Sequence, residues 1–212
     1  MSEANATAPL VLIVSGPSGS GKSTLVQKIL ELPGTMQSVS CTTRPRRATE
    51  ASGKCYAYVT EAEFDAMVAR GDFLEYARVF GKHSYGSPKK WLEEARSKNL
   101  DLVLEIDVQG AAQVKEKIPE SVAIFIVPPS PEELERRLRS RGQDADEEIN
   151  RRLARARDEI AAFGKYYDYC VVNNDVESAG REAQAIVMAL RCQSSRRRQW
   201  VEQLLASFGG KD

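Results

Sequence analysis

Mostly apolar runs alternate along this chain with segments in which apolar residues recur every three or four positions. A run of the first kind predicts a strand buried on both faces, and the recurring pattern predicts a helix with one apolar face. The apolar runs lie at 10–15, 100–107, 122–127 and 169–172. The helical pattern is clearest at 146–163 and 179–190. Strands that alternate with helices predict an α/β fold around a central parallel sheet.

The stretch between the first two runs has a different composition and predicts an inserted lobe over about 44–88. A short strand is expected just before it at 38–43, and a strand-like segment lies at 73–80. A Thr-x-x-Glu capping box at 60–63 predicts a short helix, and the Ser-Pro pair at 87–88 predicts the N-cap and first residue of another.

A second insertion follows the run at 122–127. The sequence Ser-Pro-Glu-Glu at 130–133 combines an N-cap, a proline at the first helical position and a capping-box glutamate, so a helix is expected from there to Gly142. A further helix is expected past Gly110. The predicted parts of this single domain are a core at about 10–43, 100–135 and 164–190, a lobe at 44–88, an arginine-rich helical lid at 136–163 and a C-terminal extension at 191–212.

The glycine-rich segment after the first strand carries the clearest chemical signal. It matches G-x-x-x-x-G-K-[ST] between a strand and a helix, which is the context that a phosphate-binding loop requires. The glycines let backbone amides turn toward one anion at the helix N-terminus, Lys22 supplies a mobile charge for the β- and γ-phosphates, and Ser23 is placed to ligate Mg²⁺. The predicted nucleotide-binding residues are Gly16, Pro17, Ser18, Gly19, Ser20, Gly21, Lys22, Ser23 and Thr24.

Composition excludes several classes of partner. The chain has 212 residues, 42% of them apolar, and its thirty basic and thirty acidic residues cancel, so no net charge recruits nucleic acid or an anionic membrane. A small substrate is therefore expected. No apolar run approaches the roughly 18 residues of a membrane span, and the first residues lack a basic and apolar leader, so we expect a cytoplasmic protein.

The phosphate loop alone is shared by hydrolases, motors, switches and kinases. A guanine-switch GTPase needs an Asn-Lys-x-Asp motif to read its base, and the sequence has none. The remaining pattern resembles guanylate kinase, in order and with compatible spacing, over about residues 10–190. The segments that carry the resemblance are 15–24, 38–47, 53–56, 73–76, 85–87, 105–110, 137–142 and 150–153.

The resemblance implies a three-layer P-loop kinase fold with an inserted GMP-binding lobe and a helical lid. It also implies transfer of the γ-phosphoryl group of ATP to GMP, giving ADP and GDP, with Mg²⁺ as cofactor and ATP and GMP as small-molecule substrates. Two alternatives stay open: a kinase of the same fold with another phosphorylated acceptor, and a noncatalytic guanylate-kinase-like binding module. The oligomeric state is not predicted.

By the same resemblance the inserted lobe holds the acceptor. Arg44 and Arg47 match two arginines that clamp the acceptor phosphate, but this chain reads Arg-Pro-Arg-Arg where the family usually has Arg-x-Pro-Arg, so Arg46 competes with Arg47. Tyr56 and Tyr85 add hydroxyl donors. The residues expected to bind GMP are Ser40, Arg44, Arg47, Tyr56, Glu75, Tyr85, Ser87 and Asp107.

Ser40 and Glu75 resemble the residues that read the base. A carboxylate accepts from both N1–H and the exocyclic amine of guanine, whereas adenine presents an unprotonated N1. Glu105 and Asp107 lie two apart, so both face one side at the end of a strand. Asp107 approaches guanine by resemblance, and either carboxylate could order waters around Mg²⁺; neither is needed as a general base, because the acceptor phosphate is already anionic.

Three arginines match the arginines of the family's lid, which neutralise the transferring phosphoryl group while water is excluded. Two of them, Arg137 and Arg141, are four apart and share a helix face. Asn173, after the last strand, matches a position that contacts adenine. The expected catalytic residues are Lys22, Arg44, Arg137, Arg141 and Arg152.

The extension at 191–212 contains three consecutive arginines at 196–198 followed by apolar residues at helical spacing. We expect this apolar face to dock against the chain's own core, in preference to a contact between subunits. The apolar residues are Trp200, Leu204, Leu205 and Phe208.

Overall fold

The computed structural model describes residues 8–46, 56–79, 83–140 and 145–208. Its larger sheet has five parallel strands in the order β2-β7-β1-β8-β9. These strands are β1 (Val11–Ser15), β2 (Thr35–Gln37), β7 (Asp101–Glu105), β8 (Val122–Val127) and β9 (Tyr169–Val172). The four strands predicted from apolar runs are all present, whereas β2 was not predicted, because three half-buried residues at a sheet edge leave little pattern.

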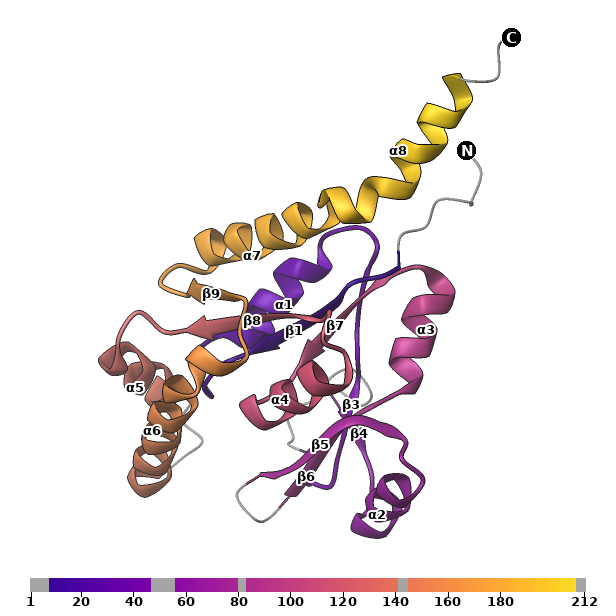
Figure 1. Cartoon of the computed structure of the whole chain (residues 1–212). Helices are drawn as coiled ribbons and strands as arrows, with labels where there is room; N and C mark the ends of the chain where they lie inside the picture. The colour runs from indigo at the N-terminus through magenta and orange to yellow at the C-terminus, as the bar shows by residue number, and fades with distance from the viewer. Residues whose placement is uncertain (1–7, 47–55, 80–82, 141–144, 209–212) are drawn as a thin grey trace.

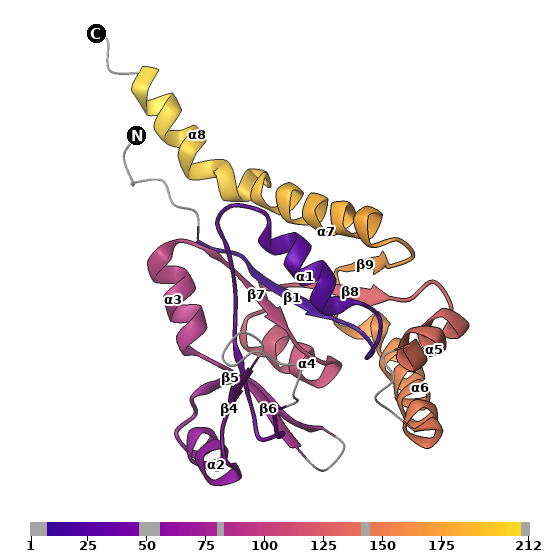
Figure 2. The same ribbon diagram turned by 180° about the vertical axis from the view of Figure 1, so that it is seen from behind.

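Helices cover both faces of this sheet, because successive side chains of a strand point to opposite faces. Leu12 and Val14 of β1 pack with α1 and α7, while Val11 and Ile13 pack with α3 and α4. Figures 1 and 2 show α7 on one side of the sheet and α4 on the other. The predicted three-layer α/β fold is therefore confirmed. The helices are α1 (Lys22–Leu30), α3 (Lys90–Lys98), α4 (Val108–Lys117) and α7 (Val176–Arg191).

A second, four-stranded sheet has the order β4-β3-β6-β5 and lies below the main sheet in Figure 1. Phe64 and Phe73 stack with ring centroids 4.7 Å apart and form its small core with Cys41. The predicted capping box is confirmed, since the side chains of Thr60 and Glu63 each accept from the other's backbone N–H. The elements are β3 (Ser40–Thr42), β4 (Tyr56–Tyr58), α2 (Glu61–Ala69), β5 (Phe73–Val79) and β6 (His83–Pro88).

Three local predictions need correction in this part of the chain. Ser87 and Pro88 do not begin a helix: they end β6, where they pair with Glu75 and Phe73, and α3 begins at Lys90. Strand pairing outweighs the local Ser-Pro signal. The strand expected at 38–43 was assigned to the core but pairs as β3 with β4 and β6 of the second sheet. Helix α4 begins at Val108, before the predicted start past Gly110.

Helices α5 (Pro131–Ser140) and α6 (Asp146–Ala161) follow β8 and pack through a separate apolar cluster. The Ser130 hydroxyl accepts from the Glu133 N–H at 3.2 Å, as the predicted N-cap requires. The carboxylate of Glu133, however, accepts from two arginines of its own helix. A short helical turn, Phe163–Lys165, ends the insertion, and the predicted helix end at Gly142 lies outside the described residues.

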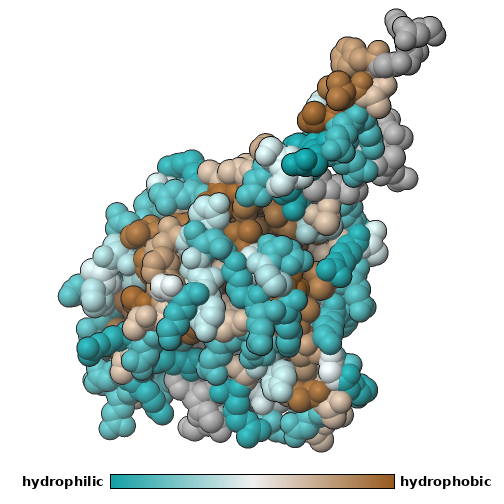
Figure 3. Space-filling view, viewed as in Figure 1, coloured by the Kyte–Doolittle hydropathy of each residue, from teal (hydrophilic) through white to brown (hydrophobic). Residues whose placement is uncertain are grey.

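The extension after α7 folds as helix α8 (Ser194–Phe208), which continues away from the body of the molecule (Figure 1). None of its residues is buried, and Leu205 and Phe208 are 72% and 76% exposed. Figure 3 shows apolar side chains gathered toward its C-terminal end. The prediction that this helix docks against the core is therefore wrong: helical spacing identified an apolar face but could not tell what covers it. No helix in the described part of the chain is long and apolar enough to cross a membrane.

Candidate active site

The glycine-rich loop joins β1 to α1 in a conformation that its glycines permit. Gly16 has φ +140°, and a Cβ there would lie 2.1 Å from the Ile126 carbonyl oxygen. Gly21 has φ +93° and directly precedes α1, which begins at Lys22. The unpaired amides and the positive end of the helix dipole therefore lie at the loop, where an anion is favoured.

Two side chains at the start of α1 make polar contacts around this loop. Lys22 Nζ donates to the carbonyl oxygens of Gly16 at 2.7 Å and Pro17 at 3.0 Å, so its ammonium spans the loop. Ser23 Oγ donates to Glu105 Oε1 at 2.6 Å. Ser23 and Glu105 thus place a hydroxyl and a carboxylate together at the carboxyl end of the sheet, a pair of oxygen donors of the type that Mg²⁺ prefers. Among the other predicted loop residues, Pro17, Gly19 and Ser20 are buried, and Ser18 and Thr24 are exposed.

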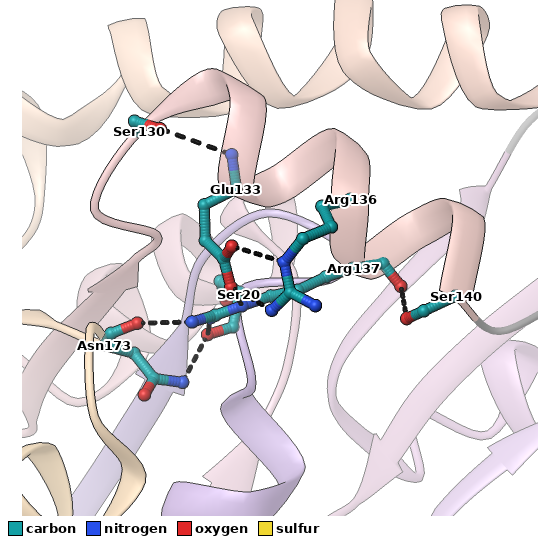
Figure 4. Close-up of polar contacts among 7 residues, drawn as sticks. All are labelled: Ser20, Ser130, Glu133, Arg136, Arg137, Ser140 and Asn173. Carbon is teal, nitrogen blue, oxygen red and sulfur yellow. Dashed lines mark hydrogen bonds and ion pairs between the residues drawn. The ribbon is translucent and has the colours of Figure 1, made fainter.

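A network around the Ser20 carbonyl connects the loop to two other elements (Figure 4). Asn173, which is 1% exposed, donates from Nδ2 to this oxygen at 2.7 Å. Arg137 of α5 donates from Nη2 to the Asn173 carbonyl at 2.8 Å and ion-pairs through Nε with Glu133 at 2.7 Å. Ionic hydrogen bonds from Arg136 and Arg137 lower the pKa of Glu133 to about 2. Asn173 therefore contacts the loop at the Ser20 carbonyl, and Arg137 contacts Asn173.

The second sheet brings three of the predicted acceptor residues together. Ser87 Oγ donates to Glu75 Oε1 at 2.6 Å, and Ser40 Oγ lies 3.3 Å from Ser87 Oγ. Glu75 is only 4% exposed. Burial raises the pKa of Glu75 to about 7, against the hydrogen bond from Ser87, and the nearby charge of Asp107 adds to the rise. The Glu75 carboxyl group therefore accepts from Ser87, and it would ionise more readily beside a ligand that brings further N–H donors.

Three further acceptor residues form a cluster beside this group, since Tyr56 pairs with Ser40 and Tyr85 lies two residues before Ser87 on β6. Arg44 Nε donates to the Tyr85 hydroxyl at 3.2 Å, and its guanidinium carbon lies 5.6 Å from the Tyr56 ring centroid. The Tyr56 and Tyr85 rings meet edge to face at 5.8 Å. Arg46 is exposed, and Arg47 lies outside the described residues. This cluster offers an arginine and two phenolic hydroxyls, groups that suit a phosphate.

Asp107 connects the core to the lid. Its Oδ1 accepts from the amides of Gln109 and Gly110 at 3.0 Å and so caps α4, while its Oδ2 pairs with Arg155 of α6 at 3.1 Å. Arg155 also pairs with Glu159 at 2.7 Å. Arg155 and Glu159 were not predicted as site residues, although their four-residue spacing on one helix marks an ion pair. Among the predicted lid arginines, Arg152 lies 3.5 Å from Glu148 and Arg141 lies outside the described residues.

Comparison with known proteins decides the family. A family model described as guanylate kinase matches residues 8–190. The chain belongs to the guanylate kinase family. Curated guanylate kinases from Myxococcus xanthus and Vibrio parahaemolyticus are 46% and 48% identical to it, over 88% and 84% of this chain and 90% and 87% of their own. The crystal structure of guanylate kinase from Anaplasma phagocytophilum matches with a TM-score of 0.73 and 36% identity, over 90% of each chain.

Membership of this family makes the protein a nucleoside monophosphate kinase. The matched range includes the loop at 16–24, both sheets and the lid, and it ends before α8. In the described residues no group of three His, Cys, Asp or Glu side chains could hold a metal by itself. A kinase site does not need one, because Mg²⁺ usually takes one or two protein oxygens and completes its shell with phosphate and water. The Ser23 and Glu105 pair fits that requirement.

Proposed function

We propose that this protein transfers the γ-phosphoryl group of ATP to GMP, giving ADP and GDP, in purine nucleotide metabolism. One observation carries the proposal: the chain combines a complete phosphate loop with a buried carboxyl group, Glu75, that is backed by two serine hydroxyls on a separate sheet. The loop suits a polyphosphate donor, and the carboxyl group suits a base that presents two adjacent N–H donors. Guanine is such a base.

On the donor side, we propose that residues 16–24 and Lys22 hold the ATP phosphates. Mg²⁺ would be held by Ser23 and Glu105 and would neutralise charge between the β- and γ-phosphates. Asn173 is proposed to lie beside adenine, in keeping with its contact to the loop at Ser20. The proposed lid arginines, which would close over the triphosphate, are Arg137, Arg141 and Arg152.

On the acceptor side, Glu75 would accept from the guanine N1–H and 2-amino groups while Ser40 and Ser87 face its O6 edge. Two guanine donors in a buried site favour the ionised carboxylate, so GMP binding would lower the pKa of Glu75 from about 7. Asp107, which adds to the raised pKa, would lie near the same base. The residues proposed to bind the acceptor phosphate are Arg44, Arg47, Tyr56 and Tyr85.

The chemistry needs positioning and charge neutralisation more than acid–base catalysis. The GMP phosphate is already an anionic nucleophile near neutral pH, so no side chain has to remove a proton from it. Lys22 and the lid arginines would neutralise charge on the equatorial oxygens of the migrating group, and Arg44 would hold the acceptor oxygen in line. The core, the lobe at 44–88 and the lid at 136–163 would close around the substrates to exclude water.

The two alternatives are not favoured. A noncatalytic binding module has no use for the Lys22 bridge across the loop or for the Ser23–Glu105 pair, and both are intact. A kinase whose acceptor lacks two adjacent N–H donors would gain nothing from the ionised form of the buried Glu75 carboxyl group. We further propose that the enzyme works in the cytoplasm; the free thiols of Cys41, Cys170 and Cys192 are in keeping with a reducing compartment.

A coupled assay of ADP release tests the proposal directly. Mg·ATP is supplied with GMP, dGMP, IMP, AMP, CMP or UMP in turn, and we expect GMP to give the highest kcat/KM by at least about tenfold over AMP. Turnover with AMP equal to that with GMP would contradict the proposed acceptor. Absence of ADP release with every monophosphate would contradict the proposed activity.

A further inference from the structure

Strand β5, which carries Glu75, is an edge strand of the second sheet, and a helix of the core supplies partners for its open edge. The order β4-β3-β6-β5 leaves one side of β5 without a neighbouring strand. On that side Gln113 of α4 accepts from the Tyr76 N–H at 3.2 Å and donates to the Tyr76 carbonyl at 2.8 Å. One glutamine amide therefore takes the place of a peptide group of a further strand.

A second side chain of α4 completes this contact. Lys117 Nζ donates to the Leu74 carbonyl at 2.5 Å. Leu74 and Tyr76 flank Glu75 on both sides, and their backbone groups point away from β6 while Glu75 pairs with Ser87 of that strand. The backbone on each side of the buried carboxyl group is thus bonded to the same helix.

The strand is irregular at this point, so its register alone does not fix the carboxyl group. A bulge separates the pairs made by Phe73 and Glu75. Bulges of this kind re-aim a side chain and interrupt the ladder, which lowers the number of strand contacts that hold the following residue. The intervening residue, Leu74, is buried in the apolar cluster to which Ala111 and Val114 of α4 belong.

Helix α4 also shapes the space around the carboxyl group itself. A Cβ added to Gly110 would lie 2.5 Å from Glu75 Oε2, so only glycine lets this carboxylate approach the helix so closely. Asp107, Gly110, Gln113 and Lys117 follow one another at spacings of three or four residues and therefore share one helix face. The same face of α4 therefore has Asp107 at the N-cap, Gly110 against the Glu75 carboxylate, and Gln113 and Lys117 bonded to the β5 backbone.

We propose that Gln113 and Lys117 are positioning residues for guanine recognition: through the β5 backbone they hold Glu75 in register with Asp107. This inference rests on the proposed function, since it assumes that Glu75 reads the acceptor base. The charged groups that act on Glu75 are Asp107, the N-cap of α4, and Lys117, the last residue of α4. Helix α4 of the core would thereby set the base specificity of the inserted lobe at 44–88.

Gln113→Met tests the proposal, because methionine keeps the length and removes both amide contacts. The readout is the ratio of kcat/KM for GMP to that for IMP, which lacks the 2-amino group. We expect the ratio to fall about fivefold, with an unchanged KM for ATP. The matched control is Gln184→Met, which removes a similar bond of 2.7 Å from a glutamine amide to the Lys28 carbonyl on the far side of the sheet. Gln184→Met should lower the melting temperature without changing the GMP to IMP ratio of kcat/KM.

Lys117→Met and Lys115→Met form a second matched pair on the same helix. Lys115 contacts the Ser121 carbonyl and Asp168 instead of β5. We expect only Lys117→Met to reduce the GMP to IMP ratio, and Lys117→Arg to restore most of it. If Gln113→Met does not fold, this pair decides the matter.

The possible outcomes separate the two proposals. Suppose that the wild-type enzyme phosphorylates GMP. If the GMP to IMP ratios of Gln113→Met and Lys117→Met then stay within a factor of 1.5 of the controls, the positioning role is wrong and the proposed function stands. If the wild-type enzyme does not phosphorylate GMP at all, the proposed function fails first.

Discussion

The proposed donor and acceptor halves of this site are built in different ways. The phosphate loop is one continuous segment, 16–24, whose shape depends on its own glycines and on contacts to backbone carbonyl oxygens. The proposed acceptor cluster takes Ser40, Glu75 and Ser87 from three strands, and α4 contacts the strand that carries Glu75. The residues of the first half are therefore adjacent in sequence, although Glu105, Arg137 and Asn173 contact them from other elements, while those of the second are brought together only by the fold of the second sheet.

Two carboxyl groups, Glu133 beside the loop and Glu75 in the acceptor cluster, have pKa values that are shifted in opposite directions. Glu133 beside the loop is ion-paired with two arginines, and its pKa falls to about 2. Glu75 has a serine hydroxyl as its hydrogen-bond partner in a buried site, and its pKa rises to about 7. A carboxylate with two ionic partners stabilises its surroundings, whereas a buried carboxyl group with a raised pKa marks a candidate ligand-binding site.

The largest expected effect is on the donor side. Lys22→Ala removes the ammonium that spans the loop, and we expect kcat to fall about a thousandfold while the protein stays folded. Lys28→Ala is the control, since Lys28 lies on the same helix and pairs with Glu177 away from the loop. Turnover of Lys22→Ala within tenfold of wild type, measured by ADP release with circular dichroism as a check on folding, would contradict the kinase mechanism.

The next effect concerns stability and pH on the acceptor side. The pKa of Glu75 is about 7 in the folded protein and near the ordinary value of 4.5 in the unfolded chain, so between these values the folded state binds more protons. The free energy of unfolding should therefore fall as pH rises through this window, by roughly 3 kcal/mol in all. Glu75→Gln lacks this proton linkage.

Urea titrations of wild type and Glu75→Gln between pH 4.5 and 8 measure this difference. The stability of wild type relative to the variant should decline with pH and level off above the pKa of Glu75. A difference that stays constant across the range would mean that Glu75 is not held in the protonated form by its burial.

The sequence was sufficient where structure depends on neighbours along the chain. The loop at 16–24, the apolar strand at 122–127 and the Thr60–Glu63 capping box each require only local residue types, and each is present as predicted. The catalytic and binding roles assigned to individual residues remain predictions.

Prediction from sequence failed where distant segments decide. Ser87 and Pro88 carry a helix-start signal, but pairing with β5 makes them a strand. Gln113, an ordinary polar residue on a helix, gains its contact with Tyr76 only through the approach of the second sheet. The same reason explains Arg155, whose contact with Asp107 spans 48 positions in sequence.

Asn173 offers a smaller test on the donor side. Its buried amide donates to the Ser20 carbonyl, so Asn173→Ala should cost about 2 kcal/mol of stability and raise the KM for ATP, with little change in the KM for GMP. Comparing ATP with GTP as donor distinguishes two roles. A residue that reads adenine changes the ratio of the two donors, whereas a residue that only supports the loop weakens both alike.

Substitution of Glu75 tests how the base is read and separates the two parts of the acceptor site. Glu75→Gln replaces one acceptor oxygen with an N–H₂ group that opposes a guanine donor, a buried mismatch that costs roughly 1 to 3 kcal/mol, so kcat/KM for GMP should fall at least about tenfold. The ratio of GMP to AMP turnover should shrink, and the KM for ATP should stay the same, because the donor loop belongs to another element. Arg44→Ala is the matched comparison: Arg44 lies with Tyr56 and Tyr85 in the proposed phosphate cluster, so its loss should weaken GMP and AMP alike. If Glu75→Gln leaves the GMP to AMP ratio unchanged, the base is read by other residues, and the buried carboxyl group serves the fold of the second sheet instead.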